Sequence, residues 1–172
     1  MKQHIVIING TGGCGKDTFV ELVSKYNRVL NVSSVDKVKE IATLAGWTGG
    51  KEEVDRKFLS VLKRLTTEYN DMSFRDIEEK VSKFRNSDLE VMFIHIREPE
   101  EIERAKNAFG AETLLIRRVG LSSITSNYSD ANVENYTYDY IIENSTLEIL
   151  EKKAMNFVSN LNSKPNILKR KI

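Results

Sequence analysis

The chain contains Gly10-Thr11-Gly12-Gly13-Cys14-Gly15-Lys16-Asp17-Thr18, a glycine-rich stretch with the spacing of a phosphate-binding P-loop. Residues 4–9 before it form a short apolar, β-branched run of the kind that makes a buried strand. After it, apolar side chains recur at helical spacing, at Phe19, Val20, Leu22, Val23 and Tyr26. The glycines therefore fall where a strand turns into a helix, which is the structural context that a P-loop requires.

This loop carries the groups that bind phosphate. Its glycines, at positions 10, 12, 13 and 15, allow backbone N–H groups to converge on an anion without clashes from Cβ atoms. The N-terminus of the following helix adds a partial positive charge, and Lys16 adds a full one. A glycine-rich turn with a chance lysine would not account for the flanking strand and helix. The sequence therefore predicts a polyphosphate site in which all of residues 10–18 contact the bound molecule.

The altered position is Asp17, where a P-loop normally has a Ser or Thr whose hydroxyl ligates Mg²⁺. A carboxylate is a hard oxygen ligand and suits Mg²⁺ at least as well. It also places a negative charge beside a triphosphate, and two like charges ~4 Å apart repel by roughly 4 kcal/mol at an effective dielectric near 20. Nucleotide binding should therefore depend strongly on a divalent cation. In the alternative, Asp17 only caps the helix and Thr18 serves the metal, so both are candidate magnesium ligands.

Composition places the chain among globular proteins. Its 172 residues fit one domain, with a hydrophobic content of 40% and a charged content of 30%. A formal net charge of +1 gives no basis for a nucleic-acid polymer or a membrane as partner. The single cysteine, Cys14, excludes an internal disulfide and a cysteine metal cluster. No apolar run is long enough for a signal peptide or a membrane span, so the expected location is the cytoplasm.

Strands and helices alternate along the rest of the chain. Apolar runs predict strands at residues 29–32, 89–96, 113–116 and 138–142. Helical periodicity with start and stop signals predicts helices at 35–45, from 51 to about 69, at 74–84, at 99–109 and from 145 to about 161. Ser73 is the expected cap of the helix at 74–84, and Ser145 is the expected cap of the last helix. Residues 121–137 are polar and without a period, which predicts a loop or small lid, and residues 163–172 a frayed tail.

This alternation predicts an α/β fold, a three-layer P-loop fold with a five-stranded parallel sheet and a small lid, in a single domain spanning residues 1–172. In such a sheet, ligands bind beyond the carboxyl ends of the strands. That edge selects the P-loop together with Ser33 to Asp36, His95 to Arg97, Arg117, Arg118, Asn144 and Ser145.

Four segments carry a resemblance to a known family. Gly15-Lys16-Asp17-Thr18 resembles the Gly-Lys-Asp-Thr loop of the deoxynucleotide monophosphate kinases of phages and bacteria, a group of the P-loop nucleoside monophosphate kinases. Residues 33–42 are similar to its Ser-Phe-Ala-Asp-Pro-Leu-Lys-Glu segment, and residues 95–101 to its Asp-Val-Arg-Phe-Pro-Asn-Glu. Residues 138–144 resemble its last strand and base-side loop. The match runs along nearly the whole chain in the right order, although animal-type phosphomevalonate kinases also use Gly-Lys-Asp.

The resemblance implies ATP and Mg²⁺ as cofactors. Lys16 would bridge the β- and γ-phosphates, and Arg117 and Arg118 would cover the migrating phosphoryl group, unless they only form a solvated strand end. Asn144 and Ser145 would flank adenine, although a helix cap alone also explains Ser145.

The partner on the acceptor side would be a small phosphorylated molecule, a nucleoside monophosphate in the first instance. Arg97 could bind its phosphate through the guanidinium fork, or could pair with a neighbouring glutamate. Asp36 could touch the acceptor's sugar or base, or could only complete a capping box with Ser33. Arg64 and Arg56 are candidates to reach the acceptor from an amphipathic helix whose wet face they otherwise form. An oligomer is possible.

One position departs from the family pattern. His95 stands where the resemblance implies an Asp that would help to hold the metal or its water shell, and a neutral imidazole serves Mg²⁺ poorly. Three functions therefore stay open. The first is an ATP- and Mg²⁺-dependent kinase of a nucleoside or deoxynucleoside monophosphate. The second is a P-loop nucleotide-binding regulator without efficient turnover, and the third a kinase of a non-nucleotide phosphorylated small molecule.

Overall fold

A computed structural model describes residues 2–120 and 133–163 of the chain. Its five-stranded sheet has the order β2-β3-β1-β4-β5. All six residues of β1 (His4–Asn9) are buried, as expected for a strand with neighbours on both sides and helices on both faces. β1 pairs in parallel with β3 (Val91–His95) and β4 (Glu112–Arg118), and β4 pairs in parallel with β5 (Tyr140–Asn144). β2 (Val29–Ser33) forms the other edge, so the predicted five-stranded α/β sheet is confirmed.

The contacts divide the chain into two compact units. The sheet unit consists of residues 1–31 and 88–172, and the helical unit of residues 32–87. The sheet unit contains α1 (Lys16–Ser24), α5 (Pro99–Phe109), the 3₁₀ turn Val133–Asn135 and α7 (Leu147–Ser163). The helical unit contains α2 (Asp36–Leu44), α3 (Glu53–Asn70) and α4 (Met72–Arg85). None of the helices in the described residues has the length and hydropathy needed to span a bilayer.

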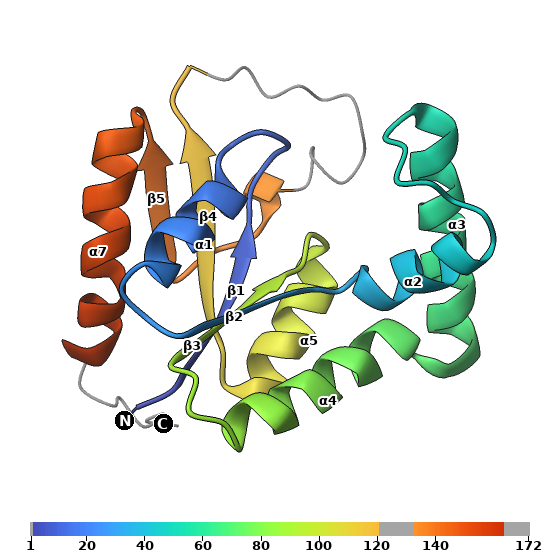
Figure 1. Ribbon diagram of the computed structural model, residues 1–172, viewed down its shortest axis with the longest axis horizontal. Coiled ribbons are helices and arrows are strands. Elements are labelled where there is room, and N and C mark those ends of the chain that lie inside the picture. Colours follow the sequence, from blue (N-terminus) through green and yellow to red (C-terminus); the bar gives the residue numbers. More distant parts are fainter. Residues whose placement is uncertain (1, 121–132, 164–172) are drawn as a thin grey trace. The chain divides into compact units, whose positions relative to one another are not determined.

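The core of the sheet unit lies between the sheet and the pair α1 and α7 (Figure 1). Phe157 of α7 is its centre, because its ring packs against Phe19 at 5.5 Å, Phe93 at 6.3 Å and Tyr140 at 5.6 Å between centroids. On the other face, α5 packs on β1 and β4 and buries Ile102. Since side chains alternate along a strand, β1 supplies apolar groups to both faces, which gives the three layers.

The helical unit is held by contacts among its three helices, with α2, α3 and α4 all touching one another. None of the residues of α3 is buried. Its periodic apolar side chains are largely exposed, with Val54 at 72% and Leu65 at 51%, while Leu59 and Leu62 are half-buried. The spacing of apolar residues thus predicted the helix correctly, but it does not identify the face of the helix that the rest of the protein covers most.

Strand β5 begins two residues later than the apolar pattern predicts. The carboxylate of Asp139 accepts hydrogen bonds from the backbone N–H of Thr113 at 2.8 Å and from its hydroxyl at 2.9 Å. Lys106 also donates to this carboxylate, at 2.8 Å. Asp139 therefore binds β4 through its side chain, and the ladder between backbones starts at Tyr140.

The predicted caps Ser73 and Ser145 are both wrong, each by one or two positions along the chain. Thr146, not Ser145, caps α7, because its hydroxyl accepts the N–H of Ile149 at 3.3 Å. Ser73 lies inside α4, which begins at Met72 directly after Asp71 in the left-handed region (φ 58°). Helix α7 includes residue 163, and the rest of the predicted tail, 164–172, lies outside the described residues, as does 121–132 of the predicted lid.

A buried polar cluster joins the amino end of the sheet to the end of α7. His4 is 5% exposed, its Nε2 lies 2.9 Å from Oδ1 of Asn162, and its Nδ1 lies 3.6 Å from the carboxylate of Glu112. The interaction with Glu112 raises the pKa of His4 above its ordinary value, against the opposing effect of burial. The protonated imidazole is therefore the form that the fold stabilises.

We predict that His4 makes the protein more stable at mildly acid than at alkaline pH. A raised folded-state pKa contributes stability that is fully present below about 6.5 and is lost as the pH rises through the folded value. Urea unfolding across this window should show the free energy of unfolding falling with rising pH in the wild type. The fall should be smaller in His4→Gln, and an unchanged fall would contradict the assignment.

Candidate nucleotide site

The loop between β1 and α1 has the backbone conformation that its glycines permit. Gly10, Gly13 and Gly15 have positive φ angles of 149°, 74° and 99°. A Cβ at Gly10 would lie 2.4 Å from the carbonyl oxygen of Ile116, and one at Gly15 would lie 2.5 Å from Nδ2 of Asn144. Glycine is thus required at positions 10 and 15 by both conformation and space.

Lys16 is the first residue of α1, and its ammonium turns back across the loop. It donates to the carbonyl oxygens of Gly10 at 2.6 Å and Thr11 at 3.0 Å, and lies 3.7 Å from Sγ of Cys14. The positive charge is therefore held over the loop, beside the N-terminus of a helix whose partial charge has the same sign. Both features favour an anion at this place.

Two side chains from the carboxyl end of the sheet hold the outer carbonyl groups of the loop. Nδ2 of Asn144 donates to the carbonyl oxygen of Cys14 at 2.9 Å, and Nη1 of Arg118 donates to that of Gly13 at 3.3 Å. The register places Arg118 of β4 directly opposite Asn144 of β5, so the two donors reach adjacent loop residues. This arrangement fixes the loop without using its N–H groups.

A cavity of about 390 Å³ opens at this loop. Its walls come from the loop and α1, from Arg118, and from the turn between β5 and α7, and the lining residues are Gly13, Gly15–Thr18, Arg118, Asn144–Leu147 and Leu150. Polar groups and the cation Lys16 lie at the loop end, whereas Leu147 and Leu150 provide apolar surface at the α7 end. A cavity with a cationic and an apolar end fits a nucleotide, whose phosphates and base differ in the same way.

The two arginines at the end of β4 have different surroundings. Arg118 lines the cavity and contacts the loop. Arg117 instead forms a bidentate pair with Glu134, with Nε to Oε1 at 3.0 Å and Nη2 to Oε2 at 2.5 Å. The hydrogen bond to Glu134 raises the pKa of Arg117 further above its ordinary value. Of the two predicted catalytic arginines, Arg118 is thus the one that lies at the loop.

The candidate metal ligands lie at the start of α1. Asp17 is 86% exposed at its side chain, and Thr18 is half-buried beside it in the cavity wall. In residues 2–120 and 133–163, His, Cys, Asp and Glu side chains form no group of three or more that could hold a metal. Asp17 and Thr18 both line the cavity and stay the predicted magnesium ligands, because their oxygens are of the kind that Mg²⁺ prefers.

His95 ends β3 next to these ligands. Its Nε2 lies 2.9 Å from Oδ1 of Asn31 and 4.0 Å from a carboxylate oxygen of Asp17. With the amide of Asn31 in this orientation, its oxygen accepts the hydrogen bond and Nε2 of His95 carries the proton. This nitrogen therefore offers no lone pair to a cation beside Asp17.

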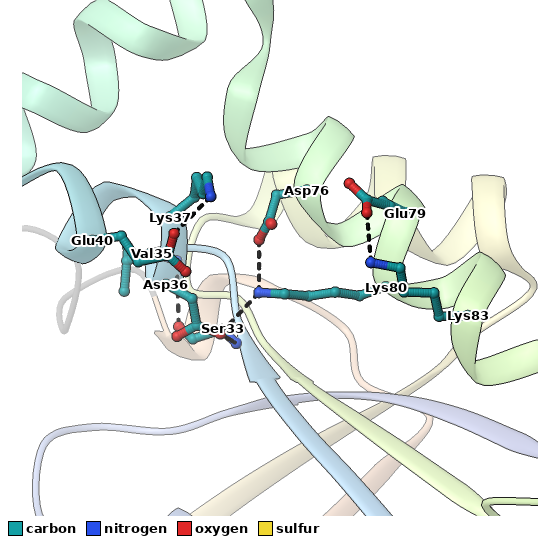
Figure 2. Close-up of polar contacts among 9 residues, drawn as sticks. All are labelled: Ser33, Val35, Asp36, Lys37, Glu40, Asp76, Glu79, Lys80 and Lys83. Carbon is teal, nitrogen blue, oxygen red and sulfur yellow. Dashed lines mark hydrogen bonds and ion pairs between the residues drawn. The ribbon is translucent and has the colours of Figure 1, made fainter. Parts of the chain in front are cut away.

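The helical unit contains two of the predicted acceptor-binding residues. Figure 2 shows Asp36 at the start of α2, where its Oδ2 accepts the N–H of Ser33 at 2.8 Å and lies 3.3 Å from Nζ of Lys80. Lys80 is held in turn by Asp76 at 2.7 Å. Hydrogen bonds and attraction from these two carboxylates outweigh burial and raise the pKa of Lys80. Asp36 thus completes half of the predicted capping box and is also an ion-pair partner of α4.

Arg64 lies on the exposed surface of α3, 3.2 Å from Glu68 one turn later. Such exposed pairs contribute little to stability. Arg56 is also exposed on α3. In the sheet unit, Arg97 is exposed beyond the end of β3, on the edge where the loop lies. The roles of these residues toward an acceptor stay predictions.

Sequence reasoning missed several residues of the site. Thr146, Leu147 and Leu150 line the cavity, and Asn9 holds the first residue of the loop. A polar residue at the end of an otherwise apolar strand is the one sequence feature that could have drawn attention to Asn9. The lining residues of α7 could not be recognised, because their leucines also fit an ordinary amphipathic helix.

Comparison with known proteins shows the fold. No protein-family model and no curated protein matches the sequence. Among solved structures, the chain is similar to a protein from Thermus thermophilus, with a TM-score of 0.57 and 16% identity over 95% of this chain and 100% of that one. It is also similar to a sugar kinase from Janibacter sp. HTCC2649, with a TM-score of 0.57 and 13% identity over 92% of this chain and 95% of that one. The chain shares its α/β fold, a parallel sheet between layers of helices, with these two proteins.

We predict that a methyl group at residue 15 damages the site more than one at residue 13. Both glycines have positive φ, but a Cβ at Gly15 would meet Asn144, whereas one at Gly13 would meet no atom within 4 Å. The strained backbone conformation costs about 1–3 kcal/mol in both variants, so only the contact with Asn144 distinguishes them. Gly15→Ala should therefore weaken ATP binding by at least tenfold relative to Gly13→Ala. Calorimetric titration of the two variants measures the difference, and equal affinities would contradict the contact with Asn144.

Proposed function

We propose that this protein is an ATP- and Mg²⁺-dependent phosphotransferase that acts on a nucleoside or deoxynucleoside monophosphate. The observation that carries the proposal is the cavity in which Lys16, Arg118 and the turn at Asn144 meet the glycine loop. A cation on each side of one loop, at a helix N-terminus, suits a polyphosphate. The resemblance of residues 33–42 and 95–101 to deoxynucleotide monophosphate kinases supports the choice of acceptor.

The chemistry asked of these residues is positioning and neutralisation of charge. Bound Mg-ATP would supply the phosphoryl group that an acceptor oxygen receives, leaving ADP. Lys16 would leave the carbonyl oxygens of Gly10 and Thr11 and donate to the β- and γ-phosphates. Arg118 would cover the charge that moves between donor and acceptor. Asp17 and Thr18 would hold the metal through their oxygens.

On the acceptor side, Arg97 would bind the acceptor's phosphate at the carboxyl edge of the sheet. A guanidinium can give two parallel hydrogen bonds to phosphate, which fixes orientation as well as charge. Asp36 would accept a hydrogen bond from the acceptor's sugar or base, and Arg64 would add positive charge from α3. The cytoplasm, where ATP and nucleotides are available, is the proposed location.

His95 favours a second candidate function, a P-loop nucleotide-binding regulator without efficient turnover. The strand end that the resemblance assigns to a carboxylate carries an imidazole that is hydrogen bonded to Asn31. The metal would then depend on Asp17 for charge compensation. A protein that binds Mg-ATP firmly but transfers slowly would follow from this arrangement.

We predict acceptor-dependent release of ADP when the protein is incubated with Mg-ATP and a panel of nucleoside and deoxynucleoside monophosphates. Turnover with a subset of the panel supports the kinase. Lys16→Ala should then lower kcat by about 10²–10³, the loss seen when one transition-state donor is removed. Tight ATP binding without release of ADP in the presence of any acceptor would support the regulator. A second panel of non-nucleotide phosphorylated compounds tests the remaining alternative, and turnover with that panel alone would support a small-molecule kinase.

We further predict that Arg118→Ala and Arg117→Ala differ in kinetics. Arg118 contacts the loop, so its removal should lower kcat by about 10²-fold or more if it stabilises the transferring phosphoryl group. Arg117 is engaged by Glu134, so its removal should lower kcat by less than about tenfold, while Glu134→Gln should reproduce its effect. Steady-state kinetics of the three variants provide the measurement, and an equal or larger loss in Arg117→Ala would reverse the assignment.

A further inference from the structure

Asn9 is a buried polar residue that neither the cavity nor the resemblance accounts for. It ends β1 and is 1% exposed. Its Oδ1 accepts the N–H of Gly10 at 2.8 Å, and its Nδ2 donates to the carbonyl oxygen of Arg97 at 3.1 Å and to the hydroxyl of Tyr138 at 2.8 Å. A buried amide is costly unless it is paired, and this one is paired on both of its atoms.

The network has one consistent direction. The hydroxyl of Tyr138 donates to the carbonyl oxygen of Val133 at 2.9 Å and therefore accepts the hydrogen bond from Asn9. Burial raises the pKa of Tyr138 to about 12, so the hydroxyl keeps its proton at neutral pH. Turning the Asn9 amide around would set its oxygen against the carbonyl of Arg97 and its NH₂ against the N–H of Gly10, which excludes the opposite orientation.

The partners of Asn9 are the first peptide of the phosphate loop and the backbone of the proposed acceptor-phosphate residue. Gly10 begins the donor loop after β1, and Arg97 follows β3, the strand that pairs with β1. Through Tyr138, the same amide reaches the turn Val133–Asn135, whose Glu134 holds Arg117. One side chain therefore contacts the segments that would carry donor and acceptor.

We propose that Asn9 is a positioning residue, with Tyr138 as its support, that fixes the separation between the donor loop and the backbone of Arg97. The inference rests on the proposed function, because the separation matters only if a donor and an acceptor bind at these two segments. Phosphoryl transfer depends on the in-line placement of two bound substrates. A displacement of about 1 Å can cost about 10²-fold in rate even when both substrates still bind.

The kinetic test compares Asn9→Ala and Tyr138→Phe with the wild type, and Asn162→Ala is the matched control. Asn162 is also an amide in a hydrogen bond, but it contacts His4 at the other end of β1. We expect Asn9→Ala to lower kcat by about 10²-fold with each KM changed by less than about threefold, since it alters placement and not the groups that bind. Tyr138→Phe should lower kcat by roughly tenfold, because Asn9 keeps its contacts to Gly10 and Arg97.

A purely structural role would lower the thermal stability of Asn9→Ala and leave kcat unchanged below the unfolding transition. That result, or a rise in KM alone, would overturn the proposal. Asn162→Ala should retain the kcat of the wild type while losing a contact of His4. A loss of kcat in Asn162→Ala equal to that in Asn9→Ala would also overturn it, because the effect would then be general.

Hydrogen exchange separates this proposal from the proposed function. The N–H of Gly10 should exchange faster in Asn9→Ala than in the wild type, since it loses its acceptor, and this readout needs no turnover. If the wild type shows no acceptor-dependent release of ADP, the proposed function fails, and faster exchange at Gly10 still supports the held loop. Unchanged exchange at Gly10 would overturn the role of Asn9 whether or not the wild type is active.

Discussion

The shape of the glycine loop depends on a constraint of the peptide backbone. If the N–H groups of the loop are to converge on an anion, its carbonyl oxygens must point elsewhere and find other donors. The structure supplies these donors: Lys16 for Gly10 and Thr11, Arg118 for Gly13, and Asn144 for Cys14. Asn9 satisfies the N–H of Gly10, which is turned inward. These side chains hold the loop from outside, and the N–H of Cys14 donates to the carbonyl oxygen of Thr11 within it at 3.3 Å.

These donors lie far apart in the sequence, and the sheet brings them together. Parallel pairing sets Arg118 opposite Asn144, and the N–H of Val119 also donates to the carbonyl oxygen of Asn144 at 3.0 Å. The register of β4 and β5 is fixed in turn by the carboxylate of Asp139 on Thr113 and by the packing of Tyr140 on Phe157. A shift of register by one residue would send these side chains to opposite faces. The geometry of the site therefore depends on contacts at the opposite end of the strands.

The sequence predicts features that depend on neighbouring residues, but it does not predict contacts between segments that lie far apart in the chain. The loop, the order of strands and helices, and the helix Pro99–Phe109 with its stop at Gly110 follow from short patterns of glycine, proline and apolar side chains, and the structure bears them out. The predicted start of β5 was wrong because the side chain of Asp139 pairs with a residue of another strand, and no feature of the neighbouring sequence indicates this pairing. The different surroundings of Arg117 and Arg118 could not be predicted for the same reason. They follow from alternation along the strand and from a partner, Glu134, that a second segment supplies.

His95 and Asp17 show how far the arrangement of charge limits the function. The resemblance implies two carboxylates near the metal, and at the two corresponding positions this chain has Asp17 and His95, whose Nε2 lies 4.0 Å from a carboxylate oxygen of Asp17. Because Nε2 of His95 faces an amide oxygen of Asn31, it acts as a hydrogen-bond donor and adds no negative charge. The protein would then neutralise less of the charge of a magnesium ion at Asp17, and the phosphates of the bound nucleotide would have to neutralise more of it. This favours binding of the metal together with the nucleotide over binding of the metal alone, so the loop, and not a preformed metal centre, would set the affinity for Mg-ATP.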